Sequence, residues 1–182
     1  MQFIRKIINA LRRNRKEKYL KRLMENGLTL GKDVEIIDTF FFDPSHCYLI
    51  SIGDNCTICP GVRLIAHDAS TKKFLGYTRL GKITIKENCF IGDSAIILSG
   101  VTIGPNCIIG AGSIVTRDIP PNTVAAGNPA KVMGPLDEYL EKIKGAAEGK
   151  RVFNEDYFIE NLDQKKRKEL LNSVGNGIGF IV

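Results

Sequence analysis

The sequence contains two histidines, His46 and His67, and histidine is the side chain that most readily exchanges a proton near pH 7. His67 opens the stretch HDASTKKFLGYTRLGK, and His46 lies within FFFDPSHCYLI. Both stretches interrupt a regular pattern that fills much of the chain. Binding and catalytic residues often sit in such insertions. From its position alone, His67 suits either a general base toward a hydroxyl or an amine, or an ordinary solvated loop residue.

An aspartate follows His67 directly, which suggests an imidazole held in place by a carboxylate. Successive side chains of a strand point to opposite faces, so Asp68 need not touch the ring of His67. Asp68 could instead contact the molecule that gives up the proton, or cap the loop. The sequence leaves these three roles open.

The five cysteines offer a competing chemistry, because Cys56 and Cys59 form a C-x-x-C pair. No second pair follows at zinc-binding spacing. Cys56, Cys89 and Cys107 instead share one position of the repeat described next, as small core residues do. We expect buried thiols and no metal centre.

The regular pattern is an aliphatic residue at every sixth position. From residue 85 onward these residues are all β-branched: Ile85, Ile91, Ile97, Ile103, Ile109 and Val115. Two earlier blocks keep the spacing, namely Leu30, Ile36 and Phe42, and then Ile52, Ile58 and Leu64. A period of six fits neither the 3.6-residue period of a helix nor the two-residue period of a strand.

Short strands that alternate with corners produce such a period. Glycine and asparagine, which tolerate the positive φ of a tight corner, recur between the aliphatic residues. Three strands close one triangular coil, and coils stack at about 4.8 Å. A β-sandwich is disfavoured because its strands repeat every 8 to 12 residues or so. We predict an all-β solenoid, a parallel β-helix over residues 28–134, with residues 67–82 as a protruding loop.

Both ends of the chain are predicted to be helical. Residues 1–27 form a basic helix, because positions 1–22 carry a net charge of +8 and leave −2 for the rest. Its apolar stripe comprises Phe3, Ile7, Ile8, Leu11, Tyr19, Leu20 and Leu23. Residues 135–182 form an extension with a helix in LDEYLEKIKGAAEGK and a second near 155–173. The basic charge belongs to an arm, so nucleic-acid binding is disfavoured, and no apolar run reaches the length of about 18 residues needed to span a membrane.

The chain resembles the hexapeptide-repeat acyltransferases, which include galactoside, maltose and xenobiotic acetyltransferases, over ITIKENCFIGDSAIILSGVTIGPNCIIGAGSIVTRDIPPNTVAAGNPAKVMG. The resemblance implies a left-handed parallel β-helix and a homotrimer with active sites between subunits. It implies acetyl-CoA as cosubstrate, bound in the cleft between neighbouring β-helices. The stretch AHDASTKKFLGYT is similar to members that acetylate sugars of surface polysaccharides.

On this resemblance His67 stands where the family places its catalytic histidine. The acceptor is then expected to be a sugar or a sugar nucleotide. The expected acceptor contacts are Asp43, His46, Asp68 and Tyr77, with Phe41 or Tyr48 stacking on the sugar ring. An ordinary loop around Pro44 is the alternative for the residues near His46.

The resemblance also implies a set of CoA contacts. Phe90 replaces a tryptophan that lines the cofactor cleft in many relatives, and Asp93 replaces a smaller residue. The full expected set is Phe90, Asp93, Ala111, Gly112, Thr116, Arg117 and Lys131. The β-helical carbonic anhydrases need three histidine ligands, which two histidines do not supply, so we expect direct acetyl transfer without a metal or a covalent intermediate.

Alternatives remain for the acceptor and for the basic helix. The acceptor could be an amino sugar nucleotide or an amino acid such as serine, or the chain could be a non-catalytic β-helical scaffold. The basic helix could cap the coil, contact an anionic membrane from one side, or help to bind the phosphates of CoA. No signal peptide is recognisable, so we expect a cytoplasmic protein.

Overall fold

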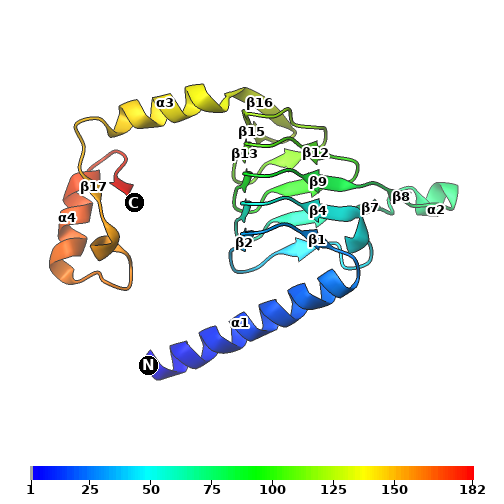
Figure 1. Cartoon of the computed structure of the whole chain (residues 1–182), viewed down its shortest axis with the longest axis horizontal. Coiled ribbons are helices and arrows are strands. Elements are labelled where there is room, and N and C mark those ends of the chain that lie inside the picture. The colour runs from blue at the N-terminus through cyan, green and yellow to red at the C-terminus, as the bar shows by residue number, and fades with distance from the viewer. Residues whose placement is uncertain (1) are drawn as a thin grey trace. The chain divides into compact units, whose positions relative to one another are not determined.

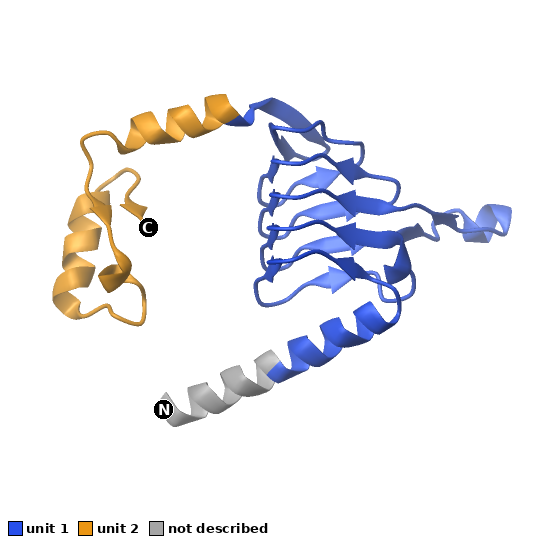
Figure 2. Ribbon diagram, in the orientation of Figure 1, with its two compact units in different colours: residues 1–136 blue, residues 137–182 orange. Residues whose placement is uncertain are grey.

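The computed structural model describes the backbone of residues 2–182 and the side chains of residues 14–182 (Figure 1). The chain divides into two compact units, residues 1–136 and residues 137–182 (Figure 2). The first unit contains the N-terminal helix and all of the six-residue repeats. It also contains every residue expected to do chemistry.

Three parallel sheets form the walls of the first unit, and each sheet takes one strand from each coil (Figure 1). The first sheet contains β1 (Thr29–Leu30), β4 (Ile50–Ile52), β9 (Ile83–Ile85) and β12 (Thr102–Ile103). The second contains β2 (Glu35–Ile36), β5 (Thr57–Ile58), β10 (Phe90–Ile91), β13 (Ile108–Ile109) and β15 (Thr123–Gly127), with β16 (Ala130–Pro135) added antiparallel. The third contains β3 (Phe41–Phe42), β6 (Arg63–Ile65), β11 (Ile96–Leu98) and β14 (Ile114–Val115). The predicted parallel coil of short strands is confirmed.

The aliphatic residues of the repeat stack on one another inside this coil. In the first sheet Ile85 pairs with Ile52 on one side and Ile103 on the other. The equivalent stacks in the other sheets are Ile58, Ile91 and Ile109, and Leu64, Ile97 and Val115. All nine side chains are at most 2% exposed. The continuous core therefore follows directly from the six-residue spacing.

The cysteines belong to the same core. All five are free and buried, including Cys56 and Cys59 of the C-x-x-C pair. This placement supports the interpretation of these thiols as small core residues.

Asparagines build a ladder along one column of corners. Asn88, Asn106 and Asn122 have φ of 56°, 56° and 57°, the left-handed region that asparagine tolerates better than most residues. The side-chain amide of Asn88 donates to Asn106 Oδ1 at 3.1 Å, and that of Asn106 donates to Asn122 Oδ1 at 2.8 Å. Each corner is thereby bonded to the next.

Replacing Asn106 with alanine should lower the free energy of unfolding by about 1–3 kcal/mol, because strain at positive φ adds to the loss of two amide hydrogen bonds. Asn106→Gly is the matched control, since it loses the same bonds without the strain. We expect urea denaturation to rank the proteins as wild type, then glycine, then alanine. Equal losses in both variants would show that the backbone conformation is not the cause.

The two interruptions of the pattern leave the coil on the side of the third sheet. Residues 67–82 extend outward as an antiparallel pair, β7 (His67–Asp68) and β8 (Arg79–Leu80), with the short helix α2 (Lys72–Leu75) between them (Figure 1). The other interruption contains the 3₁₀ turn η1 (Cys47–Leu49), which follows His46. The predicted protruding loop is therefore present.

The N-terminal helix α1 (Gln2–Glu25) caps the first coil. Leu23 is 1% exposed and belongs to the core, and Tyr19 and Leu20 pack against it. The thiol of Cys47 lies 3.5 Å from the carbonyl oxygens of both Leu23 and Asn26. A solenoid needs such a cover at its open end. The other members of the predicted stripe, Phe3, Ile7, Ile8 and Leu11, lie outside the residues whose side chains are described.

The second unit begins within α3 (Leu136–Ala147) and continues through β17 (Val152–Phe153), the 3₁₀ turn η2 (Glu155–Tyr157), α4 (Gln164–Val174) and β18 (Phe180–Ile181). The prediction of one helix over 155–173 was wrong at its start. Asp163 caps α4 by accepting a hydrogen bond from the backbone nitrogen of Lys166 at 2.7 Å, so the helix begins at residue 164. The apolar tail pairs with the strand that follows α3, because β18 runs parallel to β17. None of the helices that the structure describes combines the length and the apolar character that crossing a bilayer requires.

Candidate active site

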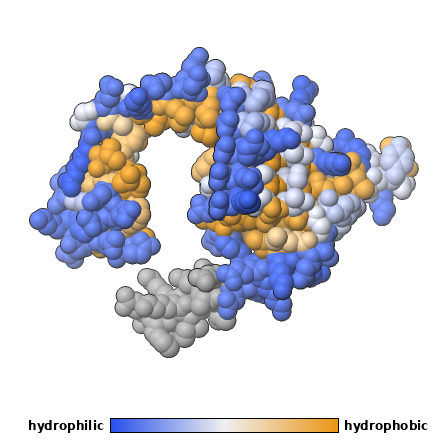
Figure 3. Space-filling model, in the orientation of Figure 1, coloured by the Kyte–Doolittle hydropathy of each residue, from blue (hydrophilic) through white to orange (hydrophobic). Residues whose placement is uncertain are grey.

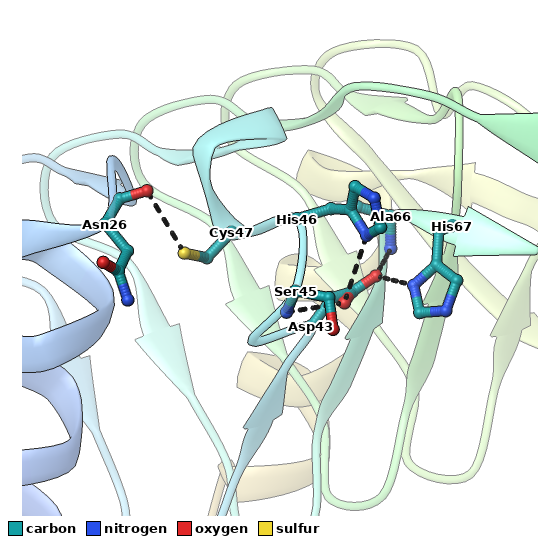
Figure 4. A network of polar contacts seen from close by, with 7 residues as sticks. All are labelled: Asn26, Asp43, Ser45, His46, Cys47, Ala66 and His67. Atoms are coloured by element: carbon teal, nitrogen blue, oxygen red, sulfur yellow. Dashed lines mark hydrogen bonds and ion pairs between the residues drawn. The ribbon is translucent and has the colours of Figure 1, made fainter.

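A buried carboxylate brings the two histidines together (Figure 4). Asp43 is fully buried, and its Oδ2 lies 2.5 Å from Nδ1 of His67. Its Oδ1 lies 3.8 Å from Nδ1 of His46, which is too long for a hydrogen bond. The centroids of the two imidazole rings are 4.8 Å apart.

Strand pairing explains why Asp43 meets His67. Phe42 of β3 pairs with Leu64 of β6, and the backbone nitrogen of Asp43 donates to the carbonyl of Leu64 at 2.9 Å. Asp43 therefore lies one coil away from the residues that lead into His67. Two separate stretches that leave the third sheet at this corner supply the carboxylate and the imidazole.

Two backbone hydrogen bonds fix the carboxylate. The nitrogen of Ala66 donates to Asp43 Oδ2 at 3.1 Å, and the nitrogen of Ser45 donates to Oδ1 at 3.2 Å (Figure 4). Because Oδ2 already accepts a hydrogen bond from a backbone N–H, it meets the imidazole as an acceptor. We therefore assign the proton of neutral His67 to Nδ1, and Nε2 carries the free lone pair.

The imidazole of His67 is partly accessible. The His67 side chain is 34% exposed, whereas that of Asp43 is 1% exposed. In Figure 4 the second ring nitrogen of His67 points away from Asp43. A partly exposed imidazole with a buried carboxylate behind it has the geometry that general-base chemistry needs.

His46 lies beside this pair without a hydrogen bond at its inner nitrogen. Its Nδ1 is buried and has no hydrogen-bond partner among the described residues. Its side chain is 25% exposed, and its ring lies 5.9 Å from that of Tyr48, centroid to centroid. Tyr48 is 56% exposed. These two rings form the accessible surface next to His67.

Asp68 turns away from His67, as the alternation of strand side chains allows. Its Oδ2 accepts from Nη2 of Arg79 at 2.6 Å, and its Oδ1 accepts from the backbone nitrogen of Ser70 at 2.8 Å. The hydrogen bonds from Ser70, followed by that from Arg79, lower the pKa of Asp68 to about 2. Asp68 thus links the two strands where the loop leaves the coil. Asp43 is the carboxylate that holds the imidazole.

The remaining expected acceptor contacts are spread along the interruptions. Tyr77 is 60% exposed in the loop, and its carbonyl accepts from the hydroxyl of Thr71 at 3.0 Å. Phe41 lies under the guanidinium of Arg63, whose Cζ is 4.8 Å from the ring centroid. Phe41 is therefore less free to stack on a ligand than Tyr48.

The expected CoA contacts fall at two corners of the coil. Asp93 follows β10, and Ala111 and Gly112 follow β13, so all three leave the second sheet, where the nitrogen of Gly112 donates to the carbonyl of Asp93 at 2.7 Å. Phe90 lies in β10 and is 42% exposed. The carboxylate of Asp93 accepts from the hydroxyl of Ser94 at 2.7 Å.

Three expected CoA contacts remain. Two lie in the same column of corners as His67, and the third lies on the final hairpin. Thr116 and Arg117 follow β14 of the third sheet, two coils beyond the corner of His67, which corresponds to about 10 Å along the coil. Lys131 lies in β16, paired with Ala126. All three side chains are exposed.

Comparison with known proteins agrees with this architecture. The family model "Bacterial transferase hexapeptide (six repeats)" matches residues 82–117. The chain is 37% identical over 173 residues to Protein CapG of Staphylococcus aureus, covering 91% of this chain and 92% of CapG. It is 40% identical over 119 residues to the galactoside O-acetyltransferase of Escherichia coli, covering 63% of this chain and 53% of that protein. Among solved structures it is similar to galactoside acetyltransferase in complex with coenzyme A, with a TM-score of 0.55, 33% identity, and coverage of 65% of this chain and 70% of that one.

Proposed function

This chain belongs to the bacterial hexapeptide transferase family and is an acetyltransferase with acetyl-CoA as its donor, and we propose that its acceptor is a sugar hydroxyl activated by His67. The buried pair of Asp43 and His67 is the observation that carries this proposal. It supplies one of the groups that an acyl transfer to a hydroxyl needs from the protein, a base with a free nitrogen.

In the proposed reaction His67 Nε2 takes the proton of the acceptor hydroxyl while its oxygen attacks the thioester carbonyl. The tetrahedral intermediate collapses, the C–S bond breaks, and the imidazolium returns the proton to the CoA thiolate. Asp43 keeps the proton of neutral His67 on Nδ1 and stabilises the imidazolium that forms. No covalent intermediate with the protein is required.

We propose that acetyl-CoA contacts residues at two different corners of the coil. Thr116 and Arg117 share the corner column of His67, whereas Phe90, Asp93, Ala111 and Gly112 belong to the second sheet and its corner. One chain presents these sets on different edges of the prism, so we propose that neighbouring subunits of a homotrimer supply them to a single cleft, with Lys131 contributing charge. We take the coil to be left-handed, as the resemblance to the family implies. The five buried free thiols suit the reducing cytoplasm.

The choice of a sugar acceptor has two supports. Relatives of this chain include galactoside O-acetyltransferase, whose name specifies a sugar acceptor. The surface beside His67 offers the exposed ring of Tyr48 and the imidazole of His46, and aromatic faces with hydrogen-bonding groups suit a sugar ring. His46, Tyr77 and Tyr48 are our proposed acceptor contacts.

Release of CoA thiol from acetyl-CoA should be measured with purified full-length protein and a panel of neutral sugars, sugar nucleotides, amino sugars and serine. We expect turnover to be fastest with an acceptor that offers a sugar hydroxyl, and mass spectrometry should show one added acetyl group on oxygen. Faster turnover with an amino group would contradict hydroxyl transfer. No thiol release with any acceptor, together with no thermal shift from CoA, would instead support the scaffold alternative.

A further inference from the structure

A groove of about 750 Å³ lies between α1 and the corner that leads into β3. This volume falls in the range of small-molecule sites, which is about 300–1,000 Å³. The helix contributes Arg15, Lys18 and Arg22 to its lining, and the corner contributes Asp38 and Phe40. The candidate active site described above does not use this groove.

The charge of the groove is strongly positive. Arg15, Lys18 and Arg22 are exposed, and within the described part of the chain none of them has an ion-pair partner. Lys16 also borders the groove, but its ammonium donates to the carbonyl of Ile36 at 2.7 Å. Among the residues whose side chains the structure describes, Asp38 is the single acidic one in the lining. In Figure 3 the described part of α1 is hydrophilic on its visible surface.

An apolar wall stands next to these cations. Tyr19 and Phe40 line the groove, and their ring centroids are 5.5 Å apart. Both rings are partly buried against the core. Burial is the largest of the effects that raise the pKa of Tyr19, so its hydroxyl stays neutral and adds no negative charge. Guanidinium groups beside aromatic faces suit a phosphate ester that also carries a ring or an apolar chain.

The groove is connected to the catalytic corner through packed residues. Phe40 packs on Phe42 with ring centroids 4.5 Å apart, and Phe42 precedes Asp43. The groove is lined by the segment of α1 that begins at Arg15. Leu23, just beyond the C-terminal end of that lining, accepts a hydrogen bond at its carbonyl from the thiol of Cys47, which follows His46. From Leu23 to Arg15 the helix spans about 12 Å. The Leu23 end of this segment therefore contacts the stretch that carries His46.

We propose that this groove binds the phosphate or diphosphate of the acetyl acceptor, so that the acceptor is a sugar joined through phosphate to a nucleoside or to a lipid. Arg15, Lys18 and Arg22 bind the phosphates, and Tyr19 and Phe40 contact the group beyond them. The role as acceptor site rests on the proposed function, whereas phosphate binding in the groove does not.

The test is isothermal titration of the full-length protein, without acetyl-CoA, using UDP, inorganic pyrophosphate and uridine as probes. UDP or pyrophosphate should bind and uridine should not. Arg22→Gln and Arg15→Gln should each weaken that binding about tenfold, because each removes a charge-assisted contact. Lys21→Gln is the matched control, since Lys21 neighbours Arg22 but pairs with Glu25 at 4.0 Å outside the groove. We expect that variant to stay within about twofold of wild type.

Comparing the probes distinguishes a nucleoside-linked phosphate from a lipid-linked phosphate. Tighter binding of UDP than of pyrophosphate would identify a nucleoside-linked ligand, and equal binding with the same response to Arg22→Gln would support a ligand with another carrier, such as a lipid. Phosphatidylglycerol vesicles compared with phosphatidylcholine vesicles report on the membrane alternative. Vesicle binding weakened equally by Arg22→Gln and Lys21→Gln, with no binding of UDP or pyrophosphate, would overturn the proposal in favour of a non-specific basic arm.

Two further outcomes would also overturn it. One is the absence of binding by every phosphate probe, and the other is UDP that is displaced by CoA and insensitive to Arg22→Gln, which would place the diphosphate in the donor cleft. Acetylation of a sugar nucleotide at an unchanged rate in Arg22→Gln would leave the proposed function intact while the groove fails. Conversely, phosphate binding without any acetyl transfer would leave the groove intact while the function fails.

Discussion

Replacing His67 with alanine should lower kcat/KM for acetyl transfer by about 10²–10⁴-fold, the usual contribution of a general base. The loss should fall mainly on kcat, because the imidazole acts on the proton transferred in the reaction and the donor site lies on other residues. Thiol release at saturating acetyl-CoA measures the effect, and thermal denaturation with and without CoA checks folding and donor binding. Added imidazole should restore part of the rate, since the small variant leaves room for it.

His46→Ala is the comparison variant for this experiment. It removes an imidazole whose ring centroid is only 4.8 Å from that of His67, so the two variants disturb the same corner. We expect its main effect to be a raised KM for the acceptor. If His67→Ala keeps full turnover, or if His46→Ala shows the larger loss of kcat and the rescue by imidazole, the assignment of the base is incorrect.

Much of the fold could be predicted because one spacing determines it. A β-branched residue at every sixth position leaves only one way to bury a continuous apolar face, and Ile52, Ile85 and Ile103 stack accordingly. The protruding loop was also predictable, since its residues break the spacing. The start of α4 was not, because it depends on the single cap at Asp163.

The candidate site was predictable only in part. His67 was predicted to be the base from its place in the sequence, and the alternation of strand side chains correctly raised doubt about Asp68 as its partner. Asp43 was expected to contact the acceptor, whereas the structure buries it behind the imidazole. The signal was available in the register: aligning Phe42 with Leu64, one coil apart, places the next residues of both stretches at the same corner. The irregular residues between the blocks concealed that alignment.

The groove beside α1 could not be predicted from the sequence, for a different reason. Its charge was visible in the sequence as a basic arm, but three uses of that arm remained open. The described part of the helix caps the coil through Leu23 and at the same time turns Arg15 and Arg22 toward Phe40. Capping and the proposed ligand binding are therefore compatible uses of adjoining faces of one helix, with Tyr19 belonging to both.

Asp43→Asn should reduce kcat by about 10²–10⁴-fold with little change in the KM for the acceptor. The amide has nearly the same shape as the carboxylate, but it can present its NH₂ group to Nδ1 of His67. That hydrogen bond favours the tautomer with the proton on Nε2, which removes the lone pair that takes the acceptor proton. The imidazolium formed in the reaction also loses the negative charge that stabilises it.

The same variant distinguishes a positioning residue from an acceptor contact. A residue that binds the sugar directly would raise KM on substitution, and it would leave the state of the imidazole unchanged. Nitrogen NMR of ¹⁵N-histidine-labelled protein reads that state, and in wild type we expect His67 protonated on Nδ1 in its neutral form. In Asp43→Asn the proton should move to Nε2. Asp68→Asn is the matched control, because it alters a carboxylate bonded to Arg79 and Ser70, and it should leave the His67 tautomer as it is. A raised KM with an unchanged tautomer in Asp43→Asn would show that Asp43 contacts the acceptor and does not set the tautomer of His67.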